Sequence, residues 1–304
     1  MTDPIVQKTM SGRAWAEMGV LSFVWGASFL AMQVALDEIG VASTVAHRVF
    51  WAAVALWGVI LVRGIAVPRG ARVWGAFLVM GVLNNVLPFG LMAWGLVHIE
   101  SGLAAIFNAA TALFGVLIAA LFLADEKLTR RKLTGVGLGF AGVVLAIGVD
   151  SIRNFDLRSL AQLAVLAGTL CYALAGVWAR RTLGHLPPQT AAAGMLTGAA
   201  VVMVPLAWML DGAPRLDLGA DTLFALGYVS LIATAGAFLL YYRVLAMAGS
   251  GNLMLVTLLV APVAIVLGAL VRDETLPPNA YAGFVLLAVG LVIIDGRVWK
   301  RMRG

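Results

Sequence analysis

Charge is scarce in this chain. Only 12% of its 304 residues are Asp, Glu, Lys or Arg, whereas 62% are hydrophobic and the mean hydropathy is +0.98. A soluble globular protein carries roughly 25% charged residues. This shortage excludes a water-soluble domain and predicts that the chain is surrounded by lipid.

Cysteine and histidine are equally scarce. The one cysteine, Cys171, excludes an intramolecular disulfide, and the three histidines, His47, His98 and His185, are far apart in the sequence. An integral membrane enzyme needs His, Asp or Cys gathered at one interface, so this class is only a remote alternative and we expect no catalytic residues. Without paired cysteine ligands or a phosphate-binding loop, we also expect no metal and no cofactor. The basic residues are dispersed in short loops, which argues against a nucleic-acid partner.

Long apolar runs fill most of the sequence. A helix that crosses a bilayer needs about 20 mostly apolar residues. Ten runs qualify, so the sequence predicts an all-α polytopic membrane protein with ten transmembrane helices. The first run is long enough to span and is therefore predicted to be a helix rather than a cleaved signal peptide. The predicted spans are residues 16–36, 44–62, 73–97, 101–123, 132–149, 159–179, 189–210, 220–246, 252–270 and 278–296.

The basic residues predict how these spans are oriented. With the N-terminus inside, five of the 21 lysines and arginines fall on the outer side and the remaining sixteen on the inner side. We therefore expect a bacterial inner-membrane protein with both termini in the cytoplasm. The charged stretch ADEKLTRRKLTG, residues 124–135, then lies in an inner loop, where we expect it to be solvated. The five outer residues are Arg48, Arg153, Arg158, Arg215 and Arg272.

One pattern occurs twice, 148 residues apart. ADEKLTRRKLTGVGLGFAGVVL, from residue 124, aligns with RDETLPPNAYAGFVLLAVGLVI, from residue 272. The chain thus divides into two five-helix repeats, residues 1–150 and 151–304. Because five is odd, the second repeat enters the membrane inverted, an arrangement typical of secondary transporters that bind substrate between the repeats. The matched pairs include Glu126 and Glu274, Gly135 and Gly283, and Gly142 and Gly290.

The motif Pro-x11-Glu-x-Leu-x6-Gly-x6-Gly at the end of each half, and VWGASF at residues 24–29, resemble the drug/metabolite transporter superfamily. Within it the chain is similar to the EamA-type ten-helix transporters, and in particular to the YddG-like amino-acid exporters. Arg48 and FLLYYRVL, residues 238–245, fit this resemblance, which covers nearly the whole chain. It implies export of amino acids or similar small metabolites. Phe114 departs from the pattern, because a proline is expected there, and span 1 has Trp25 and Ser28 where some multidrug members carry a glutamate.

Polar side chains near the middle of the predicted spans form the candidate substrate site, because an unsatisfied polar group is costly in hydrocarbon. Asn85 and Pro88 share a helix face, and Pro88, which has no N–H, leaves the carbonyl of Asn84 free to bind an ammonium or carboxamide group. The alternative is that these residues only pack or hydrogen-bond between helices, worth about 0.6 kcal/mol each. The candidate substrate-binding residues are Trp25, Ser28, Asn84, Asn85, Asn108, Thr111, Tyr172 and Thr234.

Hinges, a gate and a proton site complete the prediction. Pro88 and Pro262 are candidate hinges, and Tyr242 is a candidate gate residue, with a place in the interfacial aromatic belt as its alternative. His98, beside Glu100, is a candidate proton acceptor, with a polar helix cap as its alternative.

Carboxylates are absent from the central part of every predicted span. We therefore expect a neutral polar cavity that suits a zwitterion better than a cationic drug. An exporter of other small metabolites or of drugs is the nearest alternative. Proton coupling and facilitated diffusion both stay open, as do a monomer and a homodimer.

Overall fold

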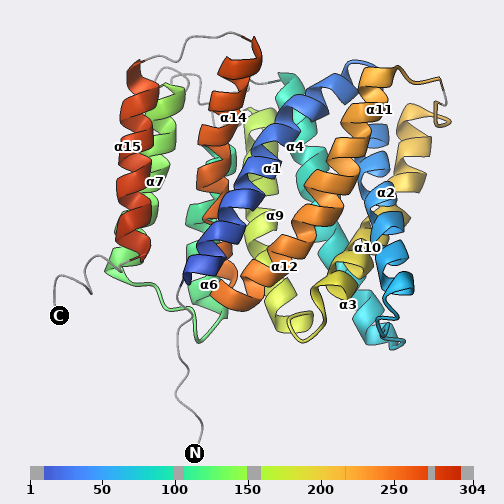
Figure 1. Cartoon of the computed structure of the whole chain (residues 1–304), viewed down its shortest axis with the longest axis horizontal. Helices are drawn as coiled ribbons and strands as arrows, with labels where there is room; N and C mark the ends of the chain where they lie inside the picture. Colours follow the sequence, from blue (N-terminus) through green and yellow to red (C-terminus); the bar gives the residue numbers. More distant parts are fainter. Residues whose placement is uncertain (1–9, 99–105, 149–158, 216, 273–277, 296–304) are drawn as a thin grey trace, which may run out of the picture.

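The computed structural model describes residues 10–98, 106–148, 159–215, 217–272 and 278–295, and all regular secondary structure within these ranges is helical (Figure 1). The elements are α1 (Gly12–Leu36), α2 (Val41–Val62), α3 (Ala71–Gly81), the π-helical turn Val82–Val86, α4 (Leu87–His98), α6 (Thr111–Phe122), α7 (Arg130–Ile147), α9 (Leu160–Thr182), α10 (Pro188–Asp211), α11 (Ala220–Gly227), the π-helical turn Tyr228–Gly236, α12 (Ala237–Ala248), α13 (Ser250–Leu253), α14 (Val256–Arg272) and α15 (Pro278–Asp295).

Within the described residues, each predicted span corresponds to one helix or to one run of helical segments; residues 101–105, 149 and 296 of the predicted spans lie outside them. In the described part of the chain, eight runs are long and apolar enough to cross a bilayer, and Ile106–Phe122 is a shorter apolar helix. The predicted all-α membrane fold is therefore confirmed. That the chain crosses the bilayer ten times stays a prediction.

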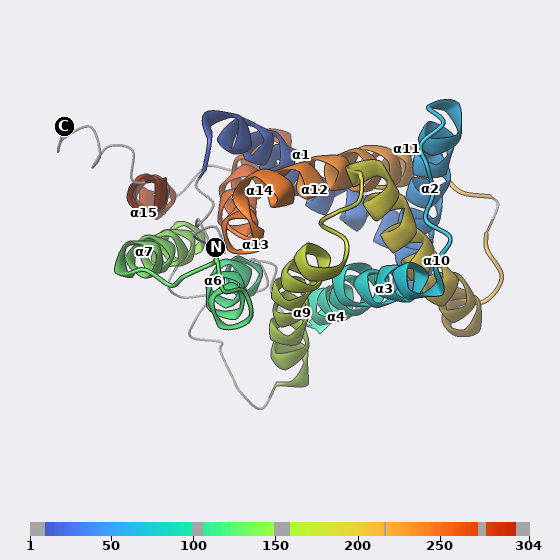
Figure 2. The same ribbon diagram turned by 90° about the horizontal axis from the view of Figure 1, so that it is seen from below.

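Seen from one end, the helices form two facing rows (Figure 2). In one row α1 packs on α14 and α12, and in the other α9 packs on α6 and α4. α2 packs on α10 at one edge of the molecule, and α7 packs on α15 at the other. The division into two inverted five-helix repeats stays a prediction.

Glycines of the repeated motif hold α7 against α15. A Cβ on Gly135 would lie 2.7 Å from the carbonyl oxygen of Gly290, and a Cβ on Gly142 would lie 2.7 Å from that of Gly283. The two backbones therefore touch, as small residues permit in membrane helices. In the repeat, Gly135 matches Gly283 and Gly142 matches Gly290, so Gly135 contacts the counterpart of Gly142, and Gly142 contacts the counterpart of Gly135. The two helices run antiparallel, because the residue numbers rise along α7 as those of the contacted residues fall along α15.

The described ends of the chain lie at the same end of the bundle. The indole Nε1 of Trp15 donates to Oδ1 of Asp295 at 2.8 Å, which joins the start of α1 to the end of α15. We call this the lower end, after its position in Figure 1; it also carries the end of α9 and α13. On the orientation predicted from the basic residues, the lower end faces the cytoplasm.

Candidate functional site

Two π-helical turns interrupt helices that correspond in the predicted repeat. Val82–Val86 joins α3 to α4, and Tyr228–Gly236 joins α11 to α12. At the repeat offset of 148 residues, the first turn matches residues 230–234 within the second. Wide turns of this kind often occur at functional sites. The buried polar residues in the two turns are Asn84, Asn85, Ser230 and Thr234.

Pro88 accounts for the first of these turns. Because proline has no N–H, it removes the usual helical bond to the carbonyl of Asn84, and the N–H of Leu87 bonds the carbonyl of Val82, five residues back. The other candidate hinge, Pro262, lies inside α14. Both prolines sit in continuous helical runs, and their role in bending stays a prediction.

Arg48 is a charged residue inside the bundle. Its side chain is 7% exposed, its Nε donates to Oγ1 of Thr234 at 2.7 Å, and its guanidinium lies over the Phe89 ring, 4.0 Å from the centroid. Tyr172 in α9 lies on the same Phe89 ring, with the two ring centroids 6.4 Å apart. Thr234 leads into α12 in one row, whereas Phe89 and Tyr172 belong to the other, so Arg48 bridges the two rows.

This position corrects two expectations from the sequence. Arg48 was assigned to the outer side, and the polar layer was expected to be neutral. In the structure Arg48 is buried in α2, seven residues from its first residue Val41, or about 10 Å at 1.5 Å per residue. An available signal was the isolated arginine within the apolar run 44–62.

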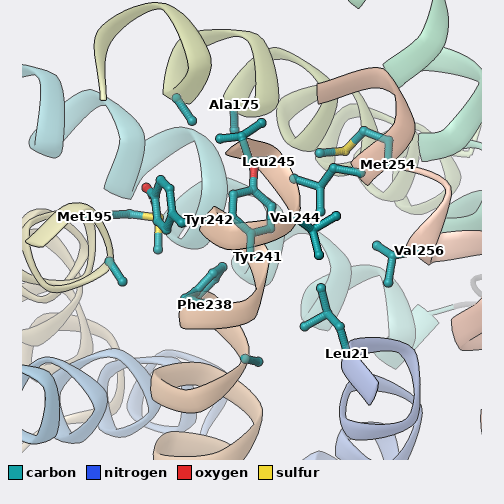
Figure 3. Packing of buried hydrophobic residues seen from close by; sticks show 14 of the residues in the cluster. Leu21, Ala175, Met195, Phe238, Tyr241, Tyr242, Val244, Leu245, Met254 and Val256 are labelled. Carbon is teal, nitrogen blue, oxygen red and sulfur yellow. The ribbon is translucent and has the colours of Figure 1, made fainter. Parts of the chain in front are cut away.

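Aromatic side chains of α1 and α12 lie beside the second π-helical turn. Trp25 donates from Nε1 to the carbonyl of Ala233 at 3.0 Å, and its ring centroid lies 6.2 Å from that of Phe238 and 6.4 Å from that of Tyr241. Figure 3 shows Tyr241 directed from α12 toward Ala175 of α9. The Tyr241 hydroxyl is buried and has no hydrogen-bond partner among the described residues.

Tyr242 lies against α10. Its hydroxyl donates to Sδ of Met195 at 3.5 Å (Figure 3). Nδ2 of Asn84 donates to the same sulfur at 3.6 Å. Tyr242 is buried, so the alternative of an interfacial belt position is wrong. The role of Tyr242 as a gate stays a prediction. Asn84 faces α10, because its amide contacts Met195.

Two of the predicted residues are buried without partners. Asn85 is 0% exposed, and neither atom of its amide has a hydrogen-bond partner among the described residues; the same holds for the Thr111 hydroxyl. Asn85 lies four residues before Phe89, and Asn108 is buried just before α6. Buried amides are normally hydrogen-bonded, so Asn85 calls for an explanation.

The remaining candidates lie in ordinary positions. Ser28 donates to the carbonyl of Trp25 in its own helix at 2.7 Å. His98 is exposed at the end of α4, with Nδ1 2.8 Å from the carbonyl oxygen of Trp94. Glu100 lies outside the described residues. The structure therefore brings Trp25, Tyr172 and Thr234 into the neighbourhood of Arg48, whereas Ser28 and His98 have local partners.

A second polar cluster lies at the lower end. The carboxylate of Glu126 is buried and accepts hydrogen bonds from the backbone N–H of Ser250 at 2.7 Å, from that of Gly251 at 2.8 Å and from the Ser250 hydroxyl at 2.9 Å. A Cβ on Gly249, whose φ is +86°, or on Gly251 would lie 2.7 Å from a Glu126 oxygen. The glycines of this loop thus leave room for a carboxylate held by backbone N–H groups.

Cations surround the same carboxylate. Arg180 at the end of α9 pairs with both Glu126 and Asp125, and Nζ of the buried Lys132 lies 3.9 Å from Oε2 of Glu126. The expectation of a solvated loop is therefore wrong for Glu126 and Lys132. Glu274, the repeat counterpart of Glu126, lies outside the described residues. We call Asp125, Glu126, Lys132, Arg180, Ser250 and Gly251 the lower-end network.

The chain is similar to known membrane transporters. The model of the EamA-like transporter family matches residues 15–148 and 159–295. "Probable terminal-alkyne amino-acid exporter" of Streptantibioticus cattleyicolor is 28% identical over 297 residues, 97% of each chain, and "Uncharacterized transporter YoaV" of Bacillus subtilis is 21% identical over 90% of this chain and 94% of its own. "Probable amino-acid metabolite efflux pump" of Salmonella typhimurium is 24% identical over 64% of this chain and 67% of its own. A solved crystal structure, 17% identical, has the same fold, with a TM-score of 0.80 over 97% of this chain and 100% of that one.

Proposed function

The chain belongs to the EamA-like transporter family, in the drug/metabolite transporter superfamily, and on this premise we propose that it exports amino acids or similar small zwitterionic metabolites by alternating access. One observation carries the proposal. Two π-helical turns hold buried polar side chains, and Arg48 connects Thr234 of the second turn to Phe89, which follows the first turn in α4. A binding site between two related halves can open to one side of the membrane and then to the other.

The substrate class is supported by the relatives. Two of them are named as an amino-acid exporter and an amino-acid metabolite efflux pump. Their names describe transporters, and we propose likewise that this chain moves a solute rather than catalysing a reaction. Its proposed site is built from Trp25, Ser28, Asn84, Asn85, Asn108, Thr111, Tyr172 and Thr234.

The lower-end network supports the mechanism. It joins the loop after α6, in the first half, to α9 and α13, in the second. We propose that the lower end is cytoplasmic, that the network holds this end closed, and that it separates when the carrier opens inward. In this scheme Pro88 and Pro262 absorb the bending, and Tyr242 moves with the gate.

The test is counterflow in liposomes that contain the purified full-length protein. Each of the twenty amino acids is loaded inside, and uptake of the labelled amino acid is measured with and without a pH gradient. We expect accelerated exchange for at least one group of amino acids. Exchange of no amino acid refutes the substrate class. The pH-gradient arm separates facilitated diffusion from proton coupling, and a His98→Gln variant then tests His98.

Asn85→Ala tests the proposed site. If the unpartnered amide binds substrate, its loss removes one or two hydrogen bonds, and the KM for exchange rises by about threefold to tenfold. Asn279→Ala is the matched control, because the Asn279 amide bonds the carbonyl of Leu145 between α7 and α15, at the edge of the molecule. Unchanged exchange by folded Asn85→Ala removes Asn85 from the site.

A further inference from the structure

Arg48 is buried without an acidic partner. In the described part of the chain no Asp or Glu lies within ion-pair distance of its guanidinium, whose one hydrogen bond runs from Nε to Thr234. A guanidinium has five N–H donors. The four donors on the two Nη atoms therefore have no partner among the described residues, although the side chain is 7% exposed.

Two other cations inside the described bundle, the buried Lys132 and the partly buried Arg180, are neutralised. Arg180 pairs with Asp125 and Glu126, and Lys132 lies beside Glu126. A charge left unpaired inside a membrane protein is costly, and such residues usually serve a ligand or ion. Arg48 thus differs from the structural cations of the same molecule in having no permanent counter-charge.

We propose that Arg48 binds the carboxylate of the transported solute. The two Nη groups of arginine form a planar fork that matches a carboxylate in a two-point contact. The Nε bond to Thr234 and the Phe89 ring hold the fork in place between the two rows. This inference rests on the proposed transport of amino acids, and it names the part of the substrate that the chain recognises.

The surroundings fit the rest of such a solute. The Asn85 amide and the Tyr241 hydroxyl are buried without partners in the described structure, and both remain available for hydrogen bonds. Trp25 and Phe89 supply aromatic surface. A cationic drug would meet the Arg48 charge without compensation, so this position selects against it. Arg48 was absent from the residues proposed from sequence, and it changes the expected neutral site into a cationic one.

Binding is measured by thermal unfolding of the full chain in detergent. The probes are the twenty L-amino acids and, for each one that raises the Tm, three analogues: the amino-acid amide, which lacks the carboxylate charge; the 2-hydroxy acid, which lacks the ammonium; and the decarboxylated amine. We expect the amino acid to raise the Tm of the wild type and the amide and amine to fail. A response to the hydroxy acid identifies a general carboxylate site, and its absence identifies one that also needs the ammonium; both agree with the proposal.

Arg48→Gln removes the charge and keeps a polar side chain. We expect the affinity for the amino acid to fall by about 10- to 100-fold, as the loss of charge-assisted hydrogen bonds predicts. We also expect its ligand-free Tm to be no lower than that of the wild type, because the unpaired buried charge is gone. A purely structural arginine gives the opposite result, a lower Tm with the ligand response intact. Arg63→Gln is the control, since Arg63 is exposed at the end of the same helix.

The inference and the proposed function fail separately. Three outcomes overturn the role of Arg48, whatever the liposome assay shows. The wild type responds equally to the amino acid and its amide, or Arg48→Gln responds to the ligand as the wild type does, or no carboxylate gives a response. A response to hydroxy acids together with no exchange of any amino acid keeps the carboxylate site and refutes the amino-acid substrate.

Discussion

Glu126→Gln should open the lower end of the molecule. The carboxylate accepts three hydrogen bonds from Ser250 and Gly251 and also pairs with Arg180. Glutamine has nearly the same shape as glutamate, but an NH2 group replaces one carboxylate oxygen. This NH2 group cannot accept the hydrogen bonds of the N–H donors and does not attract the Arg180 cation. The substitution therefore removes the charge without creating a cavity, and its effect is confined to the network.

The magnitude follows from the burial of the pair. Removing one partner of a buried ion pair costs about 3–5 kcal/mol, and each hydrogen bond to a charged group is worth about 1.5–3 kcal/mol. On our proposal these contacts exist only while the lower end is closed, so at least about 3 kcal/mol is lost from that state alone. Since 1.4 kcal/mol is a factor of ten, a closed-to-open ratio of 99:1 would fall more than 100-fold, to about equal populations.

The assay is a distance measurement between spin labels across the lower end. Labels on cysteines at Leu128, in the first half, and His185, in the second, report the separation in a Cys171→Ser background; Leu128 and His185 are both exposed. We expect Glu126→Gln to add a population at longer distance. Lys127→Gln, an exposed neighbour in the same loop, should match the parent.

A graded variant sharpens the test. Asp125→Asn leaves the Glu126 contacts in place and removes only one of the two acidic partners of Arg180, so its longer-distance population should be smaller than that of Glu126→Gln. If Glu126→Gln folds and its distance distribution equals that of the parent, the lower-end network is not a lock, and our account of the closed state is wrong.

Two further predictions concern the scaffold and the upper end of the bundle. Gly142→Val should lower the Tm in detergent by several degrees, because a Cβ there would lie 2.7 Å from the Gly283 carbonyl oxygen. Gly137→Val should change the Tm little, because a Cβ at Gly137 meets nothing within 4 Å. Equal Tm values for the two variants contradict the close α7–α15 contact. Hydrogen bonds from Thr222 and from a backbone N–H hold the pKa of Glu38 below its usual 4.5, so its contribution to stability is present above pH 4.5 and is lost as the pH falls through the lowered value. The Tm difference between wild type and Glu38→Gln should therefore be constant from about pH 7 to pH 5 and vanish in stronger acid, and a difference that grows in acid refutes this assignment.

The fold could be predicted because lipid leaves few choices. A chain in hydrocarbon has to satisfy its backbone hydrogen bonds internally, which makes each long apolar run a helix. The motif repeated after 148 residues aligned Gly135 with Gly283 and Gly142 with Gly290. The contacts in the structure join Gly135 to Gly290 and Gly142 to Gly283, and the sequence did not predict them. Composition and the length of the apolar runs were sufficient to predict the helices.

The partners of the polar residues could not be predicted in the same way. Arg48 and Thr234 are 186 residues apart, and Glu126 and Ser250 are 124 apart. Which of them meet depends on how each helix is rotated and on how the two halves pack, and a single sequence records neither. The first π-helical turn had a visible cause in Pro88, whereas no proline lies within Tyr228–Gly236, so the wide turn that places Thr234 had no comparable signal.

The lack of carboxylates in the central part of the spans leaves Arg48 without a permanent acidic partner in the described structure. An Asp or Glu at the depth of Arg48 would form a permanent intramolecular ion pair, and a solute carboxylate would then have to displace a tethered competitor present at millimolar or higher effective concentration. The lower-end network shows the contrary arrangement, in which Glu126 is tethered to its cations and only a movement of the two halves can separate them. On our proposal a carrier needs both arrangements: a cation that only the passing solute neutralises, and a lock that the chain neutralises itself. On the same proposal, the scarcity of acidic residues in the spans keeps Arg48 available for a substrate.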